Sequence, residues 1–191
     1  MNEPTAETQW SGDAHTWRPL RVLCTYRLVL AVILITGFAV TRNTDVLPVQ
    51  QPELFLRTAF GYLGFAALAL LLAIAHRPAF LVQVYAQILA DILAITLLIH
   101  ATAANELGLE VLILVAVAGG SLLTGARLGA FFAAVATVAL LTEQVLAQLA
   151  GTAPGGGYTR VAMLGIGTFA TALVGAMLAR RARENAELAA Q

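Results

Sequence analysis

Residues 79–99 read AFLVQVYAQILADILAITLLI, and His100 follows them. This stretch holds one charged side chain, Asp91, and matches the roughly 20 apolar residues that an α-helix needs to cross a bilayer. Hydrocarbon offers no partner for free backbone N–H and C=O groups, so a spanning segment of this kind must be helical. The stretch therefore predicts a transmembrane helix that carries a carboxyl group near its middle.

The same apolar character extends over most of the chain. Of its 191 residues, 59% are apolar and 12% are charged, whereas a soluble domain has about 45–50% and 25%. Five further apolar runs follow the pattern of the first: residues 20–40, 54–75, 111–123, 129–147 and 161–178. We predict an all-α, polytopic membrane bundle of six transmembrane helices. The run 111–123 is short, and its outer boundary stays open.

The polar segments complete the domain organisation. Residues 1–16 are polar and aperiodic, so we expect a flexible cytoplasmic tail there, followed by a six-helix transmembrane domain over residues 17–178. Residues 176–191 contain no Pro or Gly and are rich in good helix formers. The last helix is therefore expected to leave the membrane unbroken, with residues 179–191 as the start of a cytoplasmic helix.

The arginines predict the orientation, because short cytoplasmic loops carry an excess of positive charge. All 11 basic residues are arginines. Eight fall on the side of the termini: Arg18, Arg21, Arg27, Arg77, Arg127, Arg180, Arg181 and Arg183. Three fall on the other side: Arg42, Arg57 and Arg160. We expect a multi-pass protein of the bacterial inner membrane with both termini in the cytoplasm.

Composition and motifs also exclude several functions. The formal net charge is zero, so nothing favours a nucleic-acid partner. The single cysteine, Cys24, excludes an intrachain disulfide and a multi-cysteine metal site. Ser121 follows two glycines but lacks the pattern of a catalytic serine, and no histidine lies at its depth. We expect no metal site, no cofactor and no catalytic residue in this chain.

Polar side chains in the middle of a bilayer usually face the interior of a bundle. Gln83, Gln87 and Asp91 follow one another at four-residue steps, so they share one helix face. The face could sense, conduct or switch. Alternatively, it could form interhelical hydrogen bonds that only fix packing, with a neutral Asp91.

Glu143 is expected at a depth similar to that of Asp91, because the two spans run in the same direction. Arg57 enters its span from the outer side, so an Arg57–Glu143 pair is possible, although Glu53 competes for Arg57 one helical turn away. Glu143 could instead mark a wet outer helix end. Arg57 and Glu143 are therefore further candidates for an intramembrane polar site.

Small residues predict where helices approach closely. Gly167, Thr171 and Gly175 form one stripe on the last span. The stripe could be a surface on which this helix moves or on which two subunits meet, or it could serve close packing inside one subunit.

Four segments resemble the amino-terminal membrane region of PilS-type sensor histidine kinases. They are Trp17-x-x-Leu20-x-x-Leu23-x-x-Tyr26-Arg27-Leu28, Asp91-Ile92-Leu93-Ala94-Ile95-Thr96-Leu97-Leu98, Phe131-Phe132-Ala133-Ala134 with Ala136-Thr137, and Leu178-Ala179-Arg180-Arg181-x-Arg183-Glu184. The resemblance covers roughly residues 17–191.

The resemblance implies a six-span sensor domain that precedes an ATP-dependent kinase part. We expect the domain to work as a homodimer. In that family a response regulator controls type IV pilin transcription, and a pilin subunit in the membrane is the expected cue. The sequence contains no His-Glu-x-x-Asn-Pro phosphorylation motif and no nucleotide-binding glycine box. We therefore expect either an excised region or a natural short relative. A small transporter or channel subunit using Asp91 and Glu143, or a membrane scaffold, remains as an alternative.

Overall fold

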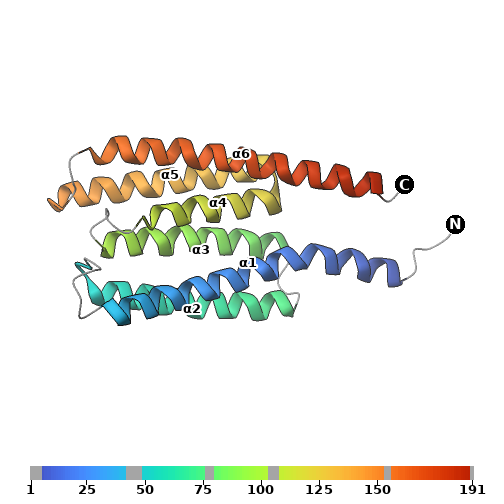
Figure 1. The fold of residues 1–191 in the computed structure, drawn as a ribbon, viewed down its shortest axis with the longest axis horizontal. Coiled ribbons are helices and arrows are strands. Elements are labelled where there is room, and N and C mark those ends of the chain that lie inside the picture. Colours follow the sequence, from blue (N-terminus) through green and yellow to red (C-terminus); the bar gives the residue numbers. More distant parts are fainter. Residues whose placement is uncertain (1–5, 42–48, 76–79, 103–107, 153–155, 190–191) are drawn as a thin grey trace.

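The computed structural model describes residues 6–41, 49–75, 80–102, 108–152 and 156–189, and these ranges fold into six α-helices joined end to end (Figure 1). The helices are α1 (Ala6–Thr41), α2 (Pro52–Ile74), α3 (Phe80–Ala101), α4 (Glu110–Thr124), α5 (Ala126–Leu149) and α6 (Gly157–Ala189). Their long axes run roughly alongside one another, so the prediction of an all-α helix bundle is confirmed.

Five of the helices are long and apolar enough to cross a membrane, and α4 is the exception. Helix α4 has 15 residues, which gives it a length of about 22 Å at the α-helical rise of about 1.5 Å per residue. A hydrocarbon core is about 30 Å thick, so α4 covers only part of that depth by itself. The fourth helix is therefore short, as the sequence predicts, and its outer end lies at Glu110.

The helices form two groups that meet along α3. Helix α2 packs against α1 and α3, whereas α6 packs against both α4 and α5. Helix α3 joins the two groups, because it also contacts α4 and α5. Figure 1 shows α1 and α2 on one side of α3, and α4, α5 and α6 on the other. Helix α1 also touches α4, but the contacts between α1 and α4 are few, so α3 is the main connection between the first group and the helices that hold α6.

The first and last helices extend beyond the other four at one end of the bundle, where both chain termini lie (Figure 1). Helix α1 begins at Ala6, so helical backbone starts inside the segment that we expected to be a polar tail. That this segment is flexible and cytoplasmic stays a prediction. Helix α6 runs without a break for 33 residues, and the predicted continuous last helix is present in the described range.

Glycine shapes the tight connection between α4 and α5. Gly125 has φ of 87°, a backbone conformation that glycine adopts without the steric penalty of a Cβ atom. Its N–H donates to the carbonyl of Ser121 at 2.8 Å and ends α4, and α5 starts at the next residue. The turn makes α4 and α5 antiparallel neighbours.

The stripe of small residues on α6 lies against α4 of the same chain. A Cβ atom on Gly167 would meet the Leu114 side chain at 3.2 Å, and one on Gly175 would meet the carbonyl oxygen of Ala118 at 3.2 Å and crowd the hydroxyl of Ser121. Thr171 lies between them and donates its hydroxyl to the Gly167 carbonyl at 2.8 Å. In this structure the stripe therefore serves close packing within one subunit.

Candidate functional site

The strongest polar feature of the bundle is an ion pair inside the predicted membrane region. Arg27 of α1 and Asp91 of α3 meet with Nε to Oδ2 at 2.7 Å and Nη2 to Oδ2 at 2.6 Å. The Arg27 side chain is 1% exposed and that of Asp91 is 4% exposed. Charges so deeply buried are unfavourable unless they are paired and hydrogen-bonded, and this pair satisfies both conditions.

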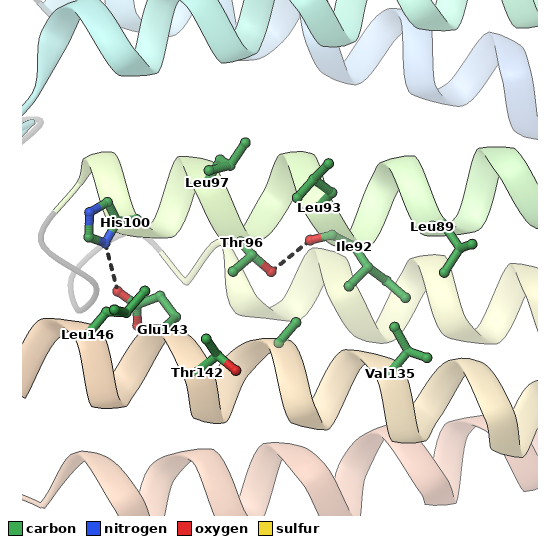
Figure 2. A pocket seen from close by; sticks show the side chains of 11 residues that line it. Leu89, Ile92, Leu93, Thr96, Leu97, His100, Val135, Thr142, Glu143 and Leu146 are labelled. Atoms are coloured by element: carbon green, nitrogen blue, oxygen red, sulfur yellow. Dashed lines mark hydrogen bonds and ion pairs between the residues drawn. The ribbon is translucent and has the colours of Figure 1, made fainter.

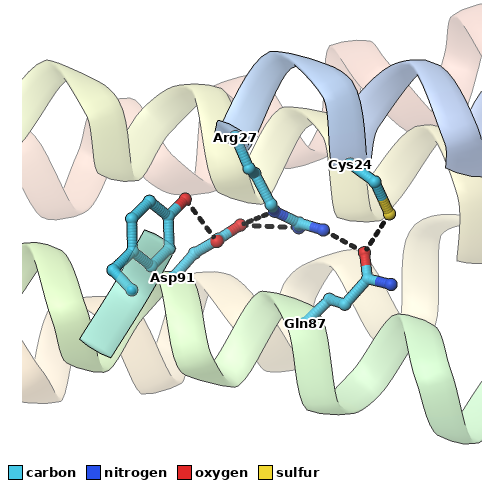
Figure 3. Close-up of polar contacts among 5 residues, drawn as sticks. Cys24, Arg27, Gln87 and Asp91 are labelled. Atoms are coloured by element: carbon cyan, nitrogen blue, oxygen red, sulfur yellow. Dashed lines mark hydrogen bonds and ion pairs between the residues drawn. The ribbon is translucent and has the colours of Figure 1, made fainter. Parts of the chain in front are cut away.

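Helices α1, α2 and α3 all contribute to the surroundings of the ion pair, as Figure 3 shows. Tyr62 of α2 donates its hydroxyl to Oδ1 of Asp91 at 2.8 Å. Gln87, one turn before Asp91, accepts hydrogen bonds through Oε1 from Nη1 of Arg27 and, at 3.4 Å, from the thiol of Cys24. We call Cys24, Arg27, Tyr62, Gln87 and Asp91 the buried polar cluster.

Gln83, Gln87 and Asp91 lie on one buried face of α3, but they have different partners. Gln87 and Asp91 belong to the buried polar cluster, whereas Gln83 donates from Nε2 to the backbone carbonyl of Ala69 on α2 at 2.7 Å. All three side chains are buried. The face thus ties α3 to α1 and α2 along about two helical turns.

Arg27 is the residue whose position we predicted wrongly. Its position near the start of the first span led us to count it with the arginines of the cytoplasmic side, but its side chain lies inside the bundle on Asp91. Without it, seven arginines remain on the side of the termini against three on the other, so the predicted orientation is unchanged. The signal that could have identified it is depth, because spans one and three run in the same direction and charged residues inside membranes usually pair.

The arrangement is that of interhelical contacts that fix the packing of three helices. Both carboxylate oxygens of Asp91 are engaged, one by Arg27 and one by Tyr62. Releasing Asp91 would leave a buried guanidinium without its counter-charge, which is strongly unfavourable. The buried polar cluster therefore holds three helices in one defined arrangement.

The other candidate residues lie at the opposite end from the termini. Arg57 pairs with Glu53 at 3.0 Å, and both side chains are largely exposed. The competing Glu53 partner is therefore the one observed, and the possible Arg57–Glu143 pair is not formed. Glu143 instead faces His100, with Oε1 and Nδ1 3.7 Å apart. Because His100 lies nine residues beyond Asp91 on α3, Glu143 lies at the end of the bundle and not, as we had expected, at the depth of Asp91.

A second polar contact at this end involves residues that we did not single out as a pair. Arg160, near the start of α6, lies 2.9 Å from Glu110, the first residue of α4. Glu110 is buried. The contact fixes the outer end of α4 to α6.

A groove of about 500 Å³ lies between α3 and α5 and ends at Glu143 (Figure 2). Its walls are apolar and include Leu89, Leu93 and Leu97 of α3 and Val135, Ala139 and Leu146 of α5. His100 and Glu143 line one end of it. The sequence could not reveal the groove, because it depends on which two helices are neighbours.

No group of three or more His, Cys, Asp or Glu side chains that could hold a metal ion occurs among the described residues. His76 lies outside the described residues, as do Asp45 and Glu106.

Comparison with known proteins places the whole bundle in one family. The model of a protein family described as "PilS-like transmembrane domain" matches residues 9–189. A curated relative, the sensor protein kinase PilS of Pseudomonas aeruginosa, is 31% identical over 172 residues, which is 90% of this chain and 32% of the relative. The chain thus spans about a third of the length of that relative. No solved structure matches this chain. With its six-helix bundle, the chain belongs to the family of PilS-like transmembrane domains, and it is a multi-pass membrane protein.

Proposed function

We propose that this chain is the membrane-embedded signal-input domain of a two-component sensor histidine kinase that controls type IV pilus genes. Its relative in P. aeruginosa is named a sensor protein kinase and is similar over nearly the whole of this chain. The kinase activity would reside in a part that this sequence does not contain. What this chain contributes is detection of a cue in the membrane and a movement of its last helix.

The observation that carries the proposal is the length of α6. Its 33 residues correspond to about 50 Å at the α-helical rise, while a hydrocarbon core is about 30 Å thick. The final part of α6 therefore projects beyond the membrane, and Arg180 and Glu184 stabilise it through an i,i+4 pair at 2.8 Å. A rigid helix that is packed inside the bundle and continues outside it can transmit a rotation or a shift.

In this function, the buried polar cluster makes the first three helices move as one unit. It ties α1, α2 and α3 together, while α6 packs on α4 and α5. A cue that shifts α3 relative to α4 and α5 would move the group that holds α6. The completely engaged carboxylate of Asp91 supports this function over the alternative of a transporter or channel that uses Asp91 to bind its ion.

The partners belong to the proposal as well. We infer that the domain works as a homodimer with both termini in the cytoplasm, which is the orientation that the arginine distribution predicts. A pilin subunit within the inner membrane is the proposed cue. A response regulator would be reached only through the kinase part.

A chimera tests the function. This chain would replace the matching membrane region of the P. aeruginosa kinase, and one to four alanines would be inserted in turn after Arg181. A transmitted rotation predicts that autophosphorylation rises and falls with the phase of the helix, about 100° per inserted residue. The same insertions within residues 1–5 are the control and should leave autophosphorylation unchanged. Activity that is insensitive to the phase in α6 would contradict the proposal.

A further inference from the structure

The groove between α3 and α5 combines an apolar channel with a charged end. The exposed Leu93 and Leu146 line its two sides. Figure 2 shows apolar side chains along the length of the two helices and His100 with Glu143 together at one end. A molecule that fits such a groove needs an apolar chain and a polar head group.

The position of the polar end fits the membrane surface. His100 is the penultimate residue of α3, and Glu143 lies in the last third of α5. Both helices end on the side opposite the termini (Figure 1). Head groups of membrane lipids lie at this level, so a lipid chain in the groove would bring its own head group to Glu143.

Glu143 determines which head group fits. Its side chain is only 6% exposed, and the His100 nitrogen that faces it is 3.7 Å away, which is longer than a hydrogen bond. Arg160 also attracts Glu143, but it lies 2.9 Å from Glu110 and pairs with that residue. A buried carboxylate is favourable only when charges and hydrogen-bond donors compensate it. A primary ammonium brings a positive charge and three N–H donors. A trimethylammonium brings the charge but no donor, and an anionic head group would be repelled.

The packing of α3 against α5 favours a lipid chain over a partner helix. The two helices contact each other, so a helix could not enter between them without separating the two groups of the bundle.

We propose that this groove binds one membrane lipid whose head group carries a primary ammonium, as in phosphatidylethanolamine. The apolar chain lies between α3 and α5, and the ammonium donates to the carboxylate of Glu143. Because α3 belongs to one group of helices and α5 to the other, the lipid bridges the two groups. This lipid binding does not depend on the signalling function proposed above.

The test measures lipid binding to the full chain by native mass spectrometry in detergent. Phosphatidylethanolamine, phosphatidylcholine and phosphatidylglycerol with identical acyl chains would be compared as probes. We expect phosphatidylethanolamine to bind about tenfold more tightly than phosphatidylcholine, as the gain of a charge-assisted hydrogen bond predicts. The preference should disappear in Glu143→Gln and persist in Glu53→Gln, which removes an exposed carboxylate at the same end of the bundle.

A second pair of variants tests the groove itself. Ala139→Phe fills the groove and should lower the binding of phosphatidylethanolamine about tenfold. Val138→Phe places the same ring on the neighbouring, exposed position outside the groove lining and should leave binding unchanged. A photoreactive phosphatidylethanolamine with its label in the acyl chain should attach to α3 and α5.

Several results would overturn the proposal. They are equal binding of phosphatidylethanolamine and phosphatidylcholine, tighter binding of phosphatidylglycerol, and attachment of the photoreactive lipid away from α3 and α5. Crosslinks that place a second copy of the chain in the groove would do the same. If Glu143→Gln does not fold, two measurements on the unmodified chain still test the proposal. They are the comparison of the three lipids and the map of attachment sites.

Discussion

Arg27 on α1 and Asp91 on α3 share one oxygen, Oδ2, through two nitrogens of the guanidinium, at 2.7 and 2.6 Å. The other oxygen of the carboxylate is bound by Tyr62 of α2. Three helices are thus joined through one side chain in a region where water is excluded. Removing any member leaves another buried polar group without compensation, and this makes the energetic role of each member measurable.

Asp91→Asn should destabilise the bundle by about 3–5 kcal/mol, because it leaves the buried Arg27 guanidinium without a counter-charge. Arg27→Met combined with Asp91→Leu should recover most of that loss, since it removes both charges. Equilibrium unfolding in detergent measures both effects. The matched control is Glu53→Gln, which breaks an exposed pair with Arg57 and should change stability by less than about 1 kcal/mol. A neutral effect of Asp91→Asn would show that the carboxyl group acts only as a packing residue.

Tyr62→Phe removes only the hydroxyl that donates to Asp91. Hydrogen bonds to charged groups contribute about 1.5–3 kcal/mol, so we expect a destabilisation in that range without loss of the fold. Tyr158→Phe is the control, because its hydroxyl bonds to Gln148 at 2.8 Å on an exposed surface. If Tyr62→Phe lowers the stability no more than its control does, the expected strength of the hydroxyl contact is wrong. The ion pair would then be the dominant contact of Asp91.

Gly175→Ala tests the contact between α6 and α4. The added Cβ atom would crowd Ser121 and the Ala118 carbonyl, so we expect a destabilisation of about 1–3 kcal/mol from overpacking. Ser121→Ala in the same chain should relieve part of it. Gly61→Ala on α2 is the control, because its Cβ atom meets nothing within 4 Å and alanine is the better helix former. Equal stability of the two alanine variants would indicate that α6 does not pack on α4 as closely as described.

Cys24 offers a probe of opening in the unmodified chain. It is the single cysteine of the sequence and is 0% exposed, so its reaction with a maleimide requires the helices around it to separate. We expect labelling to be slow in the native protein and to accelerate in Tyr62→Phe and Asp91→Asn. A Cys24→Ala chain with Leu149→Cys, an 81% exposed position, should label at once. Rapid labelling of native Cys24 would contradict its burial.

The orientation can be tested with reporter fusions. A reporter that is active only in the periplasm should be silent after Gln191, because the arginine distribution places both termini in the cytoplasm. The same reporter after Thr152, which follows five helices, should be active. The reverse pattern of activity would invert the proposed topology.

The polar groups of α3 show how far sequence reasoning reaches. Four-residue spacing placed Gln83, Gln87 and Asp91 on one face, and cost of burial predicted that this face points inward. The partners were not predictable from spacing, because they depend on which helix stands beside α3 and how that helix is rotated. Arg27 could have been proposed from its depth, but nothing in the sequence favours Tyr62 over other polar side chains of similar depth.

The pattern of apolar runs predicts a bundle of membrane helices, and it predicts the ends of five of the six helices to within a few residues. The first helix instead starts inside the segment expected to be a polar tail, and the continuation of the last helix past the bilayer stays a prediction. These properties are local, since every backbone hydrogen bond of a membrane helix is closed inside its own segment. The contacts between helices belong to the folded bundle: Arg27 meets Asp91, Glu53 holds Arg57, and α3 and α5 form a groove that ends at Glu143. They could not be predicted, because apolar side chains cover both the buried and the lipid-facing sides of these helices, so hydropathy does not mark which faces meet.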